Sequence, residues 1–291
     1  MRKILLSLLT VSAVAVVAVV ATGAYFNDTE TSVDNTFVAG ELDLQIDNTT
    51  TYYQNDVLAQ GYPQSWALKD LVGEKFFNFL DVKPEDYGEN TISLHVFDND
   101  AWACMDISPL ENNDNTCTEP EDGVDEPGTP NPNGCGTDPD AGELAQNLDF
   151  FAWLDDGLID GFQCPDDAAP CTGIDEEEGD NIWQDETESP LFTNTIGPAS
   201  DVLSGRTYTL ADSNFSILGS GPLIGSTTYY VGLAWCAGTM TVTSGTGDMT
   251  GQPDLSCDGT SMGNDTQSDS VLADLTFRAE QWRNNTPFSC Q

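Results

Sequence analysis

Two short stretches of the sequence gather oxygen-bearing side chains of the kind that bind hard metal ions. "WLDDG" and "EGDNIWQDE" together contain the candidate ligands Asp155, Asp156, Asp180, Asn181, Asp185 and Glu186. Calcium takes roughly six to eight oxygens from carboxylates, amides and backbone carbonyls. We therefore predict a bound calcium ion within residues 155–188. The alternative is a solvated acidic loop, because neither stretch has the spacing of an EF-hand.

Residue types suited to catalysis are scarce. The one histidine, His95, falls on the polar face of a predicted strand, where a surface role is expected, and zinc-protease helices need two histidines one turn apart. "GTSMG" at 259–263 matches the nucleophile elbow around Ser261, but the flanking residues are typical of a loop rather than of the required strand and helix. No phosphate loop or dinucleotide fingerprint occurs. We predict that the protein is not an enzyme.

The charge balance is strongly acidic. Eight Lys and Arg stand against 49 Asp and Glu, which gives a net charge of −41. Such a surface repels nucleic acid and anionic lipid and attracts cations, so nucleic-acid binding is excluded as a function. Calcium binding and a salt-rich habitat are both compatible with this acid excess.

Alternating apolar and polar residues predict strands in most of the chain beyond residue 40. The pattern is clearest in "ELDLQI" (41–46), where Leu42, Leu44 and Ile46 share a face, and in "TISLHV" (91–96). "STTYYVGLAW" (226–235) is apolar on both faces, as expected of a central strand. "SVLADLTFRAEQW" (270–282) alternates until Trp282 breaks the phase, which predicts a bulge or a strand end at this residue. The fold class predicted is all-β.

Two acidic segments rich in Pro and Gly interrupt these strands, at about 111–140 and 155–180. Their composition cannot bury a core, so we expect loop insertions. Between them, "AGELAQNLDFFAWL" (141–154) predicts a short helix followed by a strand. We expect one β domain over residues 41–291, decorated by two loops.

Cysteine usage points to an oxidising compartment. None of the eight forms the C-x-x-C pattern of zinc ribbons and redox sites. Eight cysteines allow 105 pairings. Proximity favours Cys117–Cys135, Cys164–Cys171, Cys236–Cys257 and Cys104–Cys290, so that both insertions are pinned by disulfides.

The N-terminus has the features of a secretory signal peptide over residues 1–24. Arg2 and Lys3 precede an apolar run, and Thr22 and Ala24 occupy the small-residue positions before a cut at Tyr25. The alternative is an uncleaved membrane anchor, because the run is long enough to span a bilayer. An anchor of this kind would be the protein's only contact with a membrane.

Three blocks of the chain resemble the TasA/camelysin family, whose members are secreted with the help of a dedicated SipW-type signal peptidase. The most specific block is "TGAYFNDTETSVDNTFVAGELDLQID" (22–47). "DVKPEDYGENTISLHVFDND" (81–100) is similar to the family's Leu-Lys-Pro-Gly-Asp segment and next strand, with Glu85 in place of the usual Gly. "ADLTFRAEQW" (273–282) resembles the closing strand. The three blocks bracket nearly the whole mature chain. The interior that contains both insertions has no counterpart in the family.

The resemblance implies a jelly-roll-like β sandwich that assembles into extracellular fibres of biofilm matrix or cell surface. The freed segment 25–40 would add as a strand to a neighbouring copy of the chain. The side chains assigned to self-assembly are Tyr25, Phe26, Phe37, Val38, Leu42 and Leu44. Protease activity, described for some camelysin relatives, is not carried over because the metal ligands are missing.

A second function competes with the fibre subunit. The chain would then be a monomeric, calcium-stabilised surface or adhesin domain, still held by its N-terminal helix in one version. The two hypotheses differ in whether the mature chain polymerises.

Overall fold

The computed structural model describes residues 42–116, 118, 120–121, 141–155, 183, 188–192, 196–242, 255–283, 285 and 287–291. All of them belong to one compact unit, Gly40–Gln291. The predicted signal peptide (1–24) and donor segment (25–40) lie outside the described residues. None of the helices within the described residues is long and apolar enough to cross a membrane.

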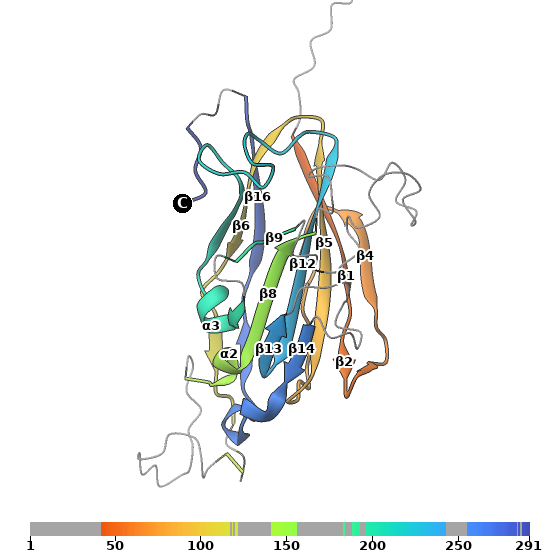
Figure 1. Ribbon diagram of the computed structural model, residues 1–291, viewed down its shortest axis with the longest axis vertical. Helices are drawn as coiled ribbons and strands as arrows, with labels where there is room; N and C mark the ends of the chain where they lie inside the picture. The colour runs from red at the N-terminus through yellow and green to blue at the C-terminus, as the bar shows by residue number, and fades with distance from the viewer. Residues whose placement is uncertain are drawn as a thin grey trace, which may run out of the picture. The chain divides into compact units, whose positions relative to one another are not determined.

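The larger of two main sheets is antiparallel and has the strand order β10-β8-β12-β5-β1-β4 (Figure 1). Three short strands, β2, β3 and β9, pair at its borders. Its strands are β1 (Asp43–Thr50), β2 (Tyr53–Gln54), β3 (Val57–Leu58), β4 (Gln64–Lys69), β5 (Tyr87–Phe97), β8 (Leu148–Leu154), β9 (Ser189–Pro190), β10 (Ile196–Pro198) and β12 (Thr227–Ala237).

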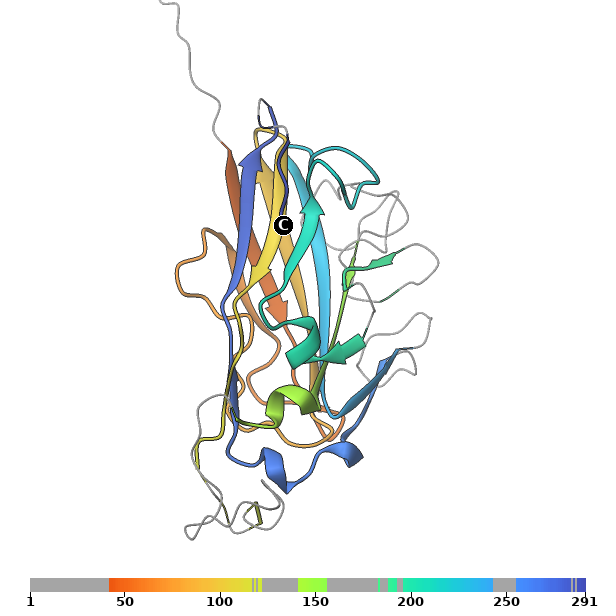
Figure 2. The same ribbon diagram turned by 90° about the vertical axis from the view of Figure 1, so that its left-hand side faces the viewer.

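The smaller sheet has the order β11-β6-β16, and Figure 2 shows these three strands side by side in front of the larger sheet. Two further antiparallel pairs, β7–β15 and β13–β14, lie outside the main sheets. The remaining elements are β6 (Ala101–Ile107), β7 (Glu111–Asn113), β11 (Thr207–Ala211), β13 (Thr239–Val242), β14 (Leu255–Asp258), β15 (Ser270–Leu272), β16 (Leu275–Gln281), α2 (Leu144–Asn147), α3 (Ala199–Val202) and two 3₁₀ turns, Gly259–Ser261 and Asn264–Thr266.

The two sheets enclose the main core, which confirms the predicted all-β sandwich. Ile92, Leu94 and Val96 of β5 are buried in this core, as their alternation in the sequence predicts. From the small sheet, β6 contributes an almost continuous buried run from Ala101 to Met105. Apolar side chains from both sheets therefore meet in one layer, the arrangement that makes a sandwich stable.

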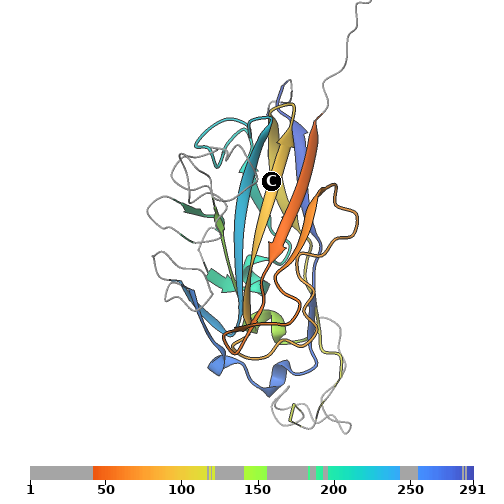
Figure 3. The same ribbon diagram turned by 90° about the vertical axis from the view of Figure 1, so that its right-hand side faces the viewer.

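Part of the outer face of the large sheet, around β8 and β12, is buried as well. Strand β12 pairs with both β8 and β5 (Figure 3), and a second apolar cluster that includes Phe151, Trp153, Trp183 and Met240 covers this face. Gly232 of β12 lies beneath the indole of Trp153, because a Cβ there would come within 2.2 Å of the ring. Burial on both sides explains why the 226–235 segment lacks a polar face, as predicted for a central strand.

Local predictions hold with two differences in detail. The segment 141–154 forms α2 and then β8, as expected. The closing segment is divided into β15 and β16, and the predicted strand end before Trp282 is observed, because β16 stops at Gln281. Residues 111–113, assigned to the first insertion, instead form β7 and pair with β15.

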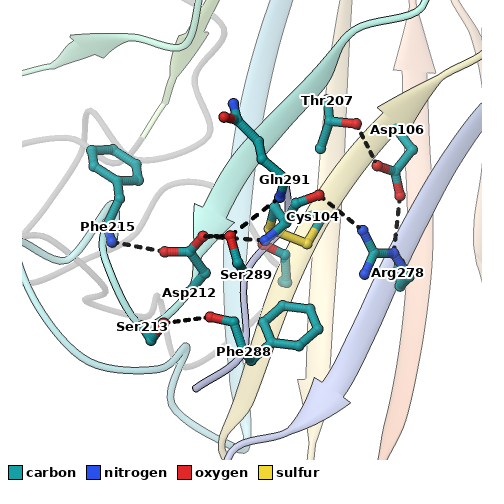
Figure 4. Close-up of a disulfide and its surroundings, with 12 residues drawn as sticks. Cys104, Asp106, Thr207, Asp212, Ser213, Phe215, Arg278, Phe288, Ser289 and Gln291 are labelled. Carbon is teal, nitrogen blue, oxygen red and sulfur yellow. Dashed lines mark hydrogen bonds and ion pairs between the residues drawn. A yellow bond between two sulfur atoms is a disulfide. The ribbon is translucent and has the colours of Figure 1, made fainter. Parts of the chain in front are cut away.

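Both disulfides within the described residues match the predicted pairs: Cys104–Cys290 and Cys236–Cys257. Pairs Cys117–Cys135 and Cys164–Cys171 lie outside the described residues. The first disulfide joins the C-terminus to β6, and Figure 4 shows Asp212 beside it.

Asp212 holds the C-terminal segment by accepting hydrogen bonds at both carboxylate oxygens. Its Oδ1 accepts from the backbone N–H groups of Asn214 and Phe215, and its Oδ2 accepts from the N–H of Cys290 at 3.2 Å. Burial alone would raise the pKa of Asp212, but these backbone donors outweigh it and hold the pKa below its ordinary value. Near neutral pH the charged form therefore ties the C-terminus to the end of β11.

A tight turn at Lys83–Asp86 contains a non-glycine residue, Glu85, in the left-handed backbone conformation. The N–H of Asp86 donates to the carbonyl of Lys83 at 2.9 Å, and Glu85, the third residue of the turn, has φ of +71°. Glycine is favoured at this position after proline, here Pro84. The turn is held by its surroundings, because the N–H of Glu85 donates to Ala237 O of β12. The glutamate thus occupies a left-handed position at which glycine is favoured.

We predict that Glu85→Gly stabilises the protein. The Glu85 side chain is exposed, so little packing is lost. The left-handed backbone costs a non-glycine residue about 1–2 kcal/mol, and the greater freedom of glycine when unfolded cancels part of that gain. The free energy of unfolding in urea should rise by about 0.5–1 kcal/mol. Glu85→Ala, which removes the same charge but keeps the strain, should change it little; equal effects of the two variants would contradict the prediction.

Candidate functional site

Three carboxylates from distant parts of the chain gather at the base of the first insertion. Asp114, Glu121 and Asp269, called here the carboxylate cluster, each offer an oxygen within 4.8 Å of the other two. Asp114 is 7% exposed and Glu121 is 0% exposed, while Asp269 is partly buried. It is the one group of three potential metal-binding side chains found among the described residues.

The β7–β15 pair brings two members of the cluster together. Asn113 lies opposite Ser270 in this antiparallel pair, and the same register places Asp114 opposite Asp269 one step beyond. Like charges directly opposite each other destabilise a strand pair. A proton or a cation held between the two carboxylates would relieve this repulsion.

Backbone groups from both ends of the insertion fix the other contacts of the cluster. Glu121 Oε2 accepts a hydrogen bond from the N–H of Thr118 at 2.8 Å. Asp269 Oδ2 accepts from the N–H groups of Glu143 and Leu144, at 2.6 and 3.0 Å, where α2 begins. The cluster thus lies where the chain leaves for residues 122–140 and where it returns.

The charges of the carboxylate cluster shift the pKa of Asp269. Burial raises the pKa of this carboxyl, the N–H groups of Glu143 and Leu144 lower it, and the nearby charges of Asp114 and Glu121 raise it again, to about 6. The ionised cluster is therefore costly in the absence of a counter-charge. What the arrangement can do chemically is hold a proton or a cation with oxygen ligands only.

The predicted calcium segment contains a second pair of buried acids. Asp155 is 0% exposed and Glu188 is 5% exposed. Leu154 lies opposite Ser189 in the β8–β9 pair, and the same register places Asp155 opposite Glu188. The other predicted ligands, Asp156, Asp180, Asn181, Asp185 and Glu186, lie outside the described residues. The calcium site within 155–188 thus stays a prediction.

His95 is a structural residue of the large sheet. Its Nε2 lies 3.1 Å from Asp47 Oδ2, and its Nδ1 lies 2.9 Å from Thr228 Oγ1, so both ring nitrogens have cross-strand partners. The ring also stacks on Phe97. These contacts bind β1, β5 and β12 together and occupy both nitrogens.

Ser261 ends the first 3₁₀ turn and is exposed. Its hydroxyl lies 3.2 Å from the hydroxyl of Thr239. A strand, β14, does precede it, but Met262 and Gly263 lead into another short 3₁₀ turn rather than into the α-helix that a nucleophile elbow requires.

One margin of the sandwich is incompletely covered by the described strands. The residues of β1 before Ile46 pair with β5 on one side only, because β4 begins pairing at Ile46. Strand β16 pairs with β6 on one side, and no described strand lies on its other side. Strand β1 begins and β16 ends beside the same β5–β6 turn, since Asp43 lies opposite Phe97 and Gln281 lies opposite Ala101. We call this region, Asp43–Gln45 with Leu275–Gln281, the open margin.

On the same margin, Phe76 connects the two sheets through its ring contacts. Phe76 contacts both Trp66 of β4 and Phe277 of β16, with ring centroids 5.4 and 6.0 Å apart. Its carbonyl accepts hydrogen bonds from Asn90 and Thr50 inside the core. Figures 2 and 3 show β1 and β16 on the same side of the sandwich.

The residues predicted for self-assembly divide into two groups. Leu42 and Leu44 are half-buried and pack against the core of their own chain, Leu44 at the open margin and Leu42 directly before it. Tyr25, Phe26, Phe37 and Val38 lie outside the described residues.

Comparison with known proteins gives no further guide to the site: no protein-family model matches the sequence, and no curated protein is significantly similar to it.

The carboxylate cluster is the feature that sequence reasoning missed. Its members are separated by up to 155 residues and belong to a chain with 49 acidic groups, so no local spacing distinguishes them. The only available signal was the position of Asp269 directly before the predicted strand segment 270–282. The partner segment, residues 111–113, was assigned to a loop, so no predicted strand pairing brought Asp114 beside Asp269.

The raised pKa of Asp269 gives the stability a specific pH dependence in calcium-free buffer. Between its ordinary pKa of 3.8 and about 6, the folded state holds a proton that the unfolded state has lost. Stability therefore falls as the pH rises through this window. In Asp269→Asn, whose amide oxygen can still accept from the two N–H groups, that part of the fall should disappear.

Thermal unfolding of both proteins from pH 4 to 7 checks this prediction. Carboxylates outside the cluster contribute equally to both curves, so the difference between the curves reports Asp269 together with its coupling to Asp114 and Glu121. Parallel curves would show that the cluster does not hold this proton.

Proposed function

We propose that this protein is a secreted structural subunit of extracellular or cell-surface fibres. Cleavage before Tyr25 would free residues 25–40, which would add as a strand to the open margin of a neighbouring copy. The observation that carries the proposal is this margin, where apolar side chains of both sheets remain half-buried beside strand edges that no described strand pairs with. The resemblance of residues 22–47 to the TasA/camelysin family supports it from the sequence.

The composition of the open margin suits an added strand. Leu44 on β1 and Leu275, Phe277 and Ala279 on β16 pack against the core but are only partly buried. An added strand would supply main-chain hydrogen bonds to β16 and place every second side chain over these residues. In this way it would bury apolar surface that a lone subunit leaves in water.

The other exposed edge of this margin is less suited to pairing. Strand β4, the outer strand of the large sheet beyond Ile46, carries Lys69, which pairs with Glu74 at 2.6 Å. Charged side chains, lysine above all, discourage pairing at sheet edges. Strand β16 also carries charges, Arg278 and Glu280, so the preference for β16 rests on its half-buried apolar side chains.

A second function, a monomeric calcium-stabilised surface domain, has support of its own. Two pairs of acids, buried Asp114 with partly buried Asp269 and buried Asp155 with buried Glu188, lie at strand-pair ends where a cation would relieve repulsion. In that case the domain would not polymerise, and the N-terminal segment would serve as an anchor.

Deletion of residues 25–40 should abolish fibres. We expect residues 25–291, expressed under oxidising conditions, to form regular filaments in negative-stain electron microscopy, and residues 41–291 to stay monomeric but folded. A synthetic peptide of residues 25–40, added in excess, should cap the open margin and stop filament growth.

The matched control is the same peptide with Phe26→Asp and Phe37→Asp, which should leave growth unchanged because the apolar anchors are gone. Filaments formed by residues 41–291, or monomers from residues 25–291 under all conditions, would contradict the fibre proposal. The second result would favour the surface domain.

Assembly should depend on salt or divalent cations. Removing residues 1–24 removes Arg2 and Lys3, so each subunit carries 6 − 49 = −43 charges. Repulsion between these charges opposes the packing of subunits in a row. At ordinary ionic strength, salt screens this repulsion over a distance of about 8–10 Å. Light scattering should show slow growth in low salt with chelator and faster growth with calcium or high salt. Equal rates in both conditions would refute this dependence.

A further inference from the structure

The carboxylate cluster at the base of the first insertion has the composition of a cation site. All its side-chain ligands are carboxylate oxygens, which hard divalent cations prefer over softer metals. Two oxygens bound to one calcium ion, each at about 2.3–2.6 Å, are at most about 5 Å apart. The oxygens of Asp114, Glu121 and Asp269 lie within 4.8 Å of one another, so they satisfy this limit.

Buried oxygens in the cluster lack the donors that such atoms normally have. Asp269 Oδ2 already accepts from the N–H groups of Glu143 and Leu144, but its Oδ1 is shielded from water and accepts no hydrogen bond. The same is true of Asp114 Oδ1 and Glu121 Oε1, although both residues have other interactions. Buried polar atoms are almost always hydrogen-bonded, and an unmet carboxylate oxygen is costly to bury.

The charge of the cluster points the same way. When ionised, the cluster carries three negative charges in a site where Asp114 and Glu121 are almost fully buried. Buried charges are normally paired or bound to metals. One divalent cation would reduce the local charge to −1 and bond to the oxygens that lack donors.

We propose that Asp114, Glu121 and Asp269 bind a structural divalent cation, with calcium as the best match. The ion would connect the end of β7, the turn at Glu121 and the start of β15. Through Asp269 it would also connect the start of α2. It would thus clamp the base of the first insertion, where the chain leaves at Glu121 and returns at Gly142.

The packing around Gly142 supports a fixed site. A Cβ on this residue would lie 3.0 Å from Asp269 Oδ2 and 3.0 Å from the backbone of Asn113, so the chain passes close to the carboxylate. The N–H of Gly142 donates to Asn112 O at 2.9 Å. These contacts hold the returning chain against β7 and limit the movement of Asp269.

The site can be tested on the full chain in mild detergent, independently of fibre formation. Calorimetric titration with calcium chloride should be done in about 0.5 M salt, which weakens diffuse binding to the acidic surface. Asp114→Asn and Asp269→Asn should each lose one bound calcium, or bind it at least about tenfold more weakly. Glu111→Gln removes one negative charge from the exposed side of β7 and should bind as the unaltered protein does.

Thermal unfolding separates a cation from a shared proton. With calcium at about a hundred times its dissociation constant, the unaltered protein should gain several degrees in melting temperature over its value in chelator. Asp269→Asn should melt higher than the unaltered protein in chelator, yet gain much less from calcium. Magnesium, which requires a tighter octahedral site, should stabilise less.

Two results would overturn the proposal. The first is unchanged calcium binding in both variants, which would place the ion elsewhere. The second is the lack of saturable binding in the folded, unaltered protein, which would show that the carboxylates share protons instead.

Discussion

The structure depends on the long antiparallel pairing of β12 with β5, which runs from Thr227 opposite Val96 to Cys236 opposite Tyr87. Every other layer is built on this pair. One face packs against the small sheet, and the other is covered by the Trp153 cluster, so β12 is apolar on both faces. Because both faces of β12 are buried, a partner would have to bind at the margins of the sandwich.

The fold could be predicted from the sequence further than the site could. Alternation over six residues was enough to orient Ile92, Leu94 and Val96, because a strand with one buried face must repeat every second residue. Sequence proximity was enough for Cys236–Cys257, and elimination then left Cys104–Cys290. The division between β15 and β16 could not be predicted, because Ala273 fits the alternation but is exposed in the folded chain.

The carboxylate cluster could not be predicted because its energy comes from burial and register rather than from spacing. Asp114 and Asp269 become neighbours only after β7 pairs with β15, in a part of the chain assigned to a loop. Repulsion between acids acts on two scales in this protein. Within a subunit it is concentrated at buried pairs, and between subunits it opposes the packing that fibres require. Divalent cations would relieve both, which links the proposed cation site to the proposed assembly.

In the proposed fibre, the open margin receives a strand from a neighbouring subunit. Hydrogen–deuterium exchange of monomers and of sedimented polymer, read by mass spectrometry over peptides that cover β16, would detect this strand. Amides of β16 that face away from β6 should exchange quickly in the monomer and at least about tenfold more slowly in the polymer, while the already paired β12 should change little. Unchanged exchange in β16, or new protection confined to β4, would contradict strand addition at the open margin.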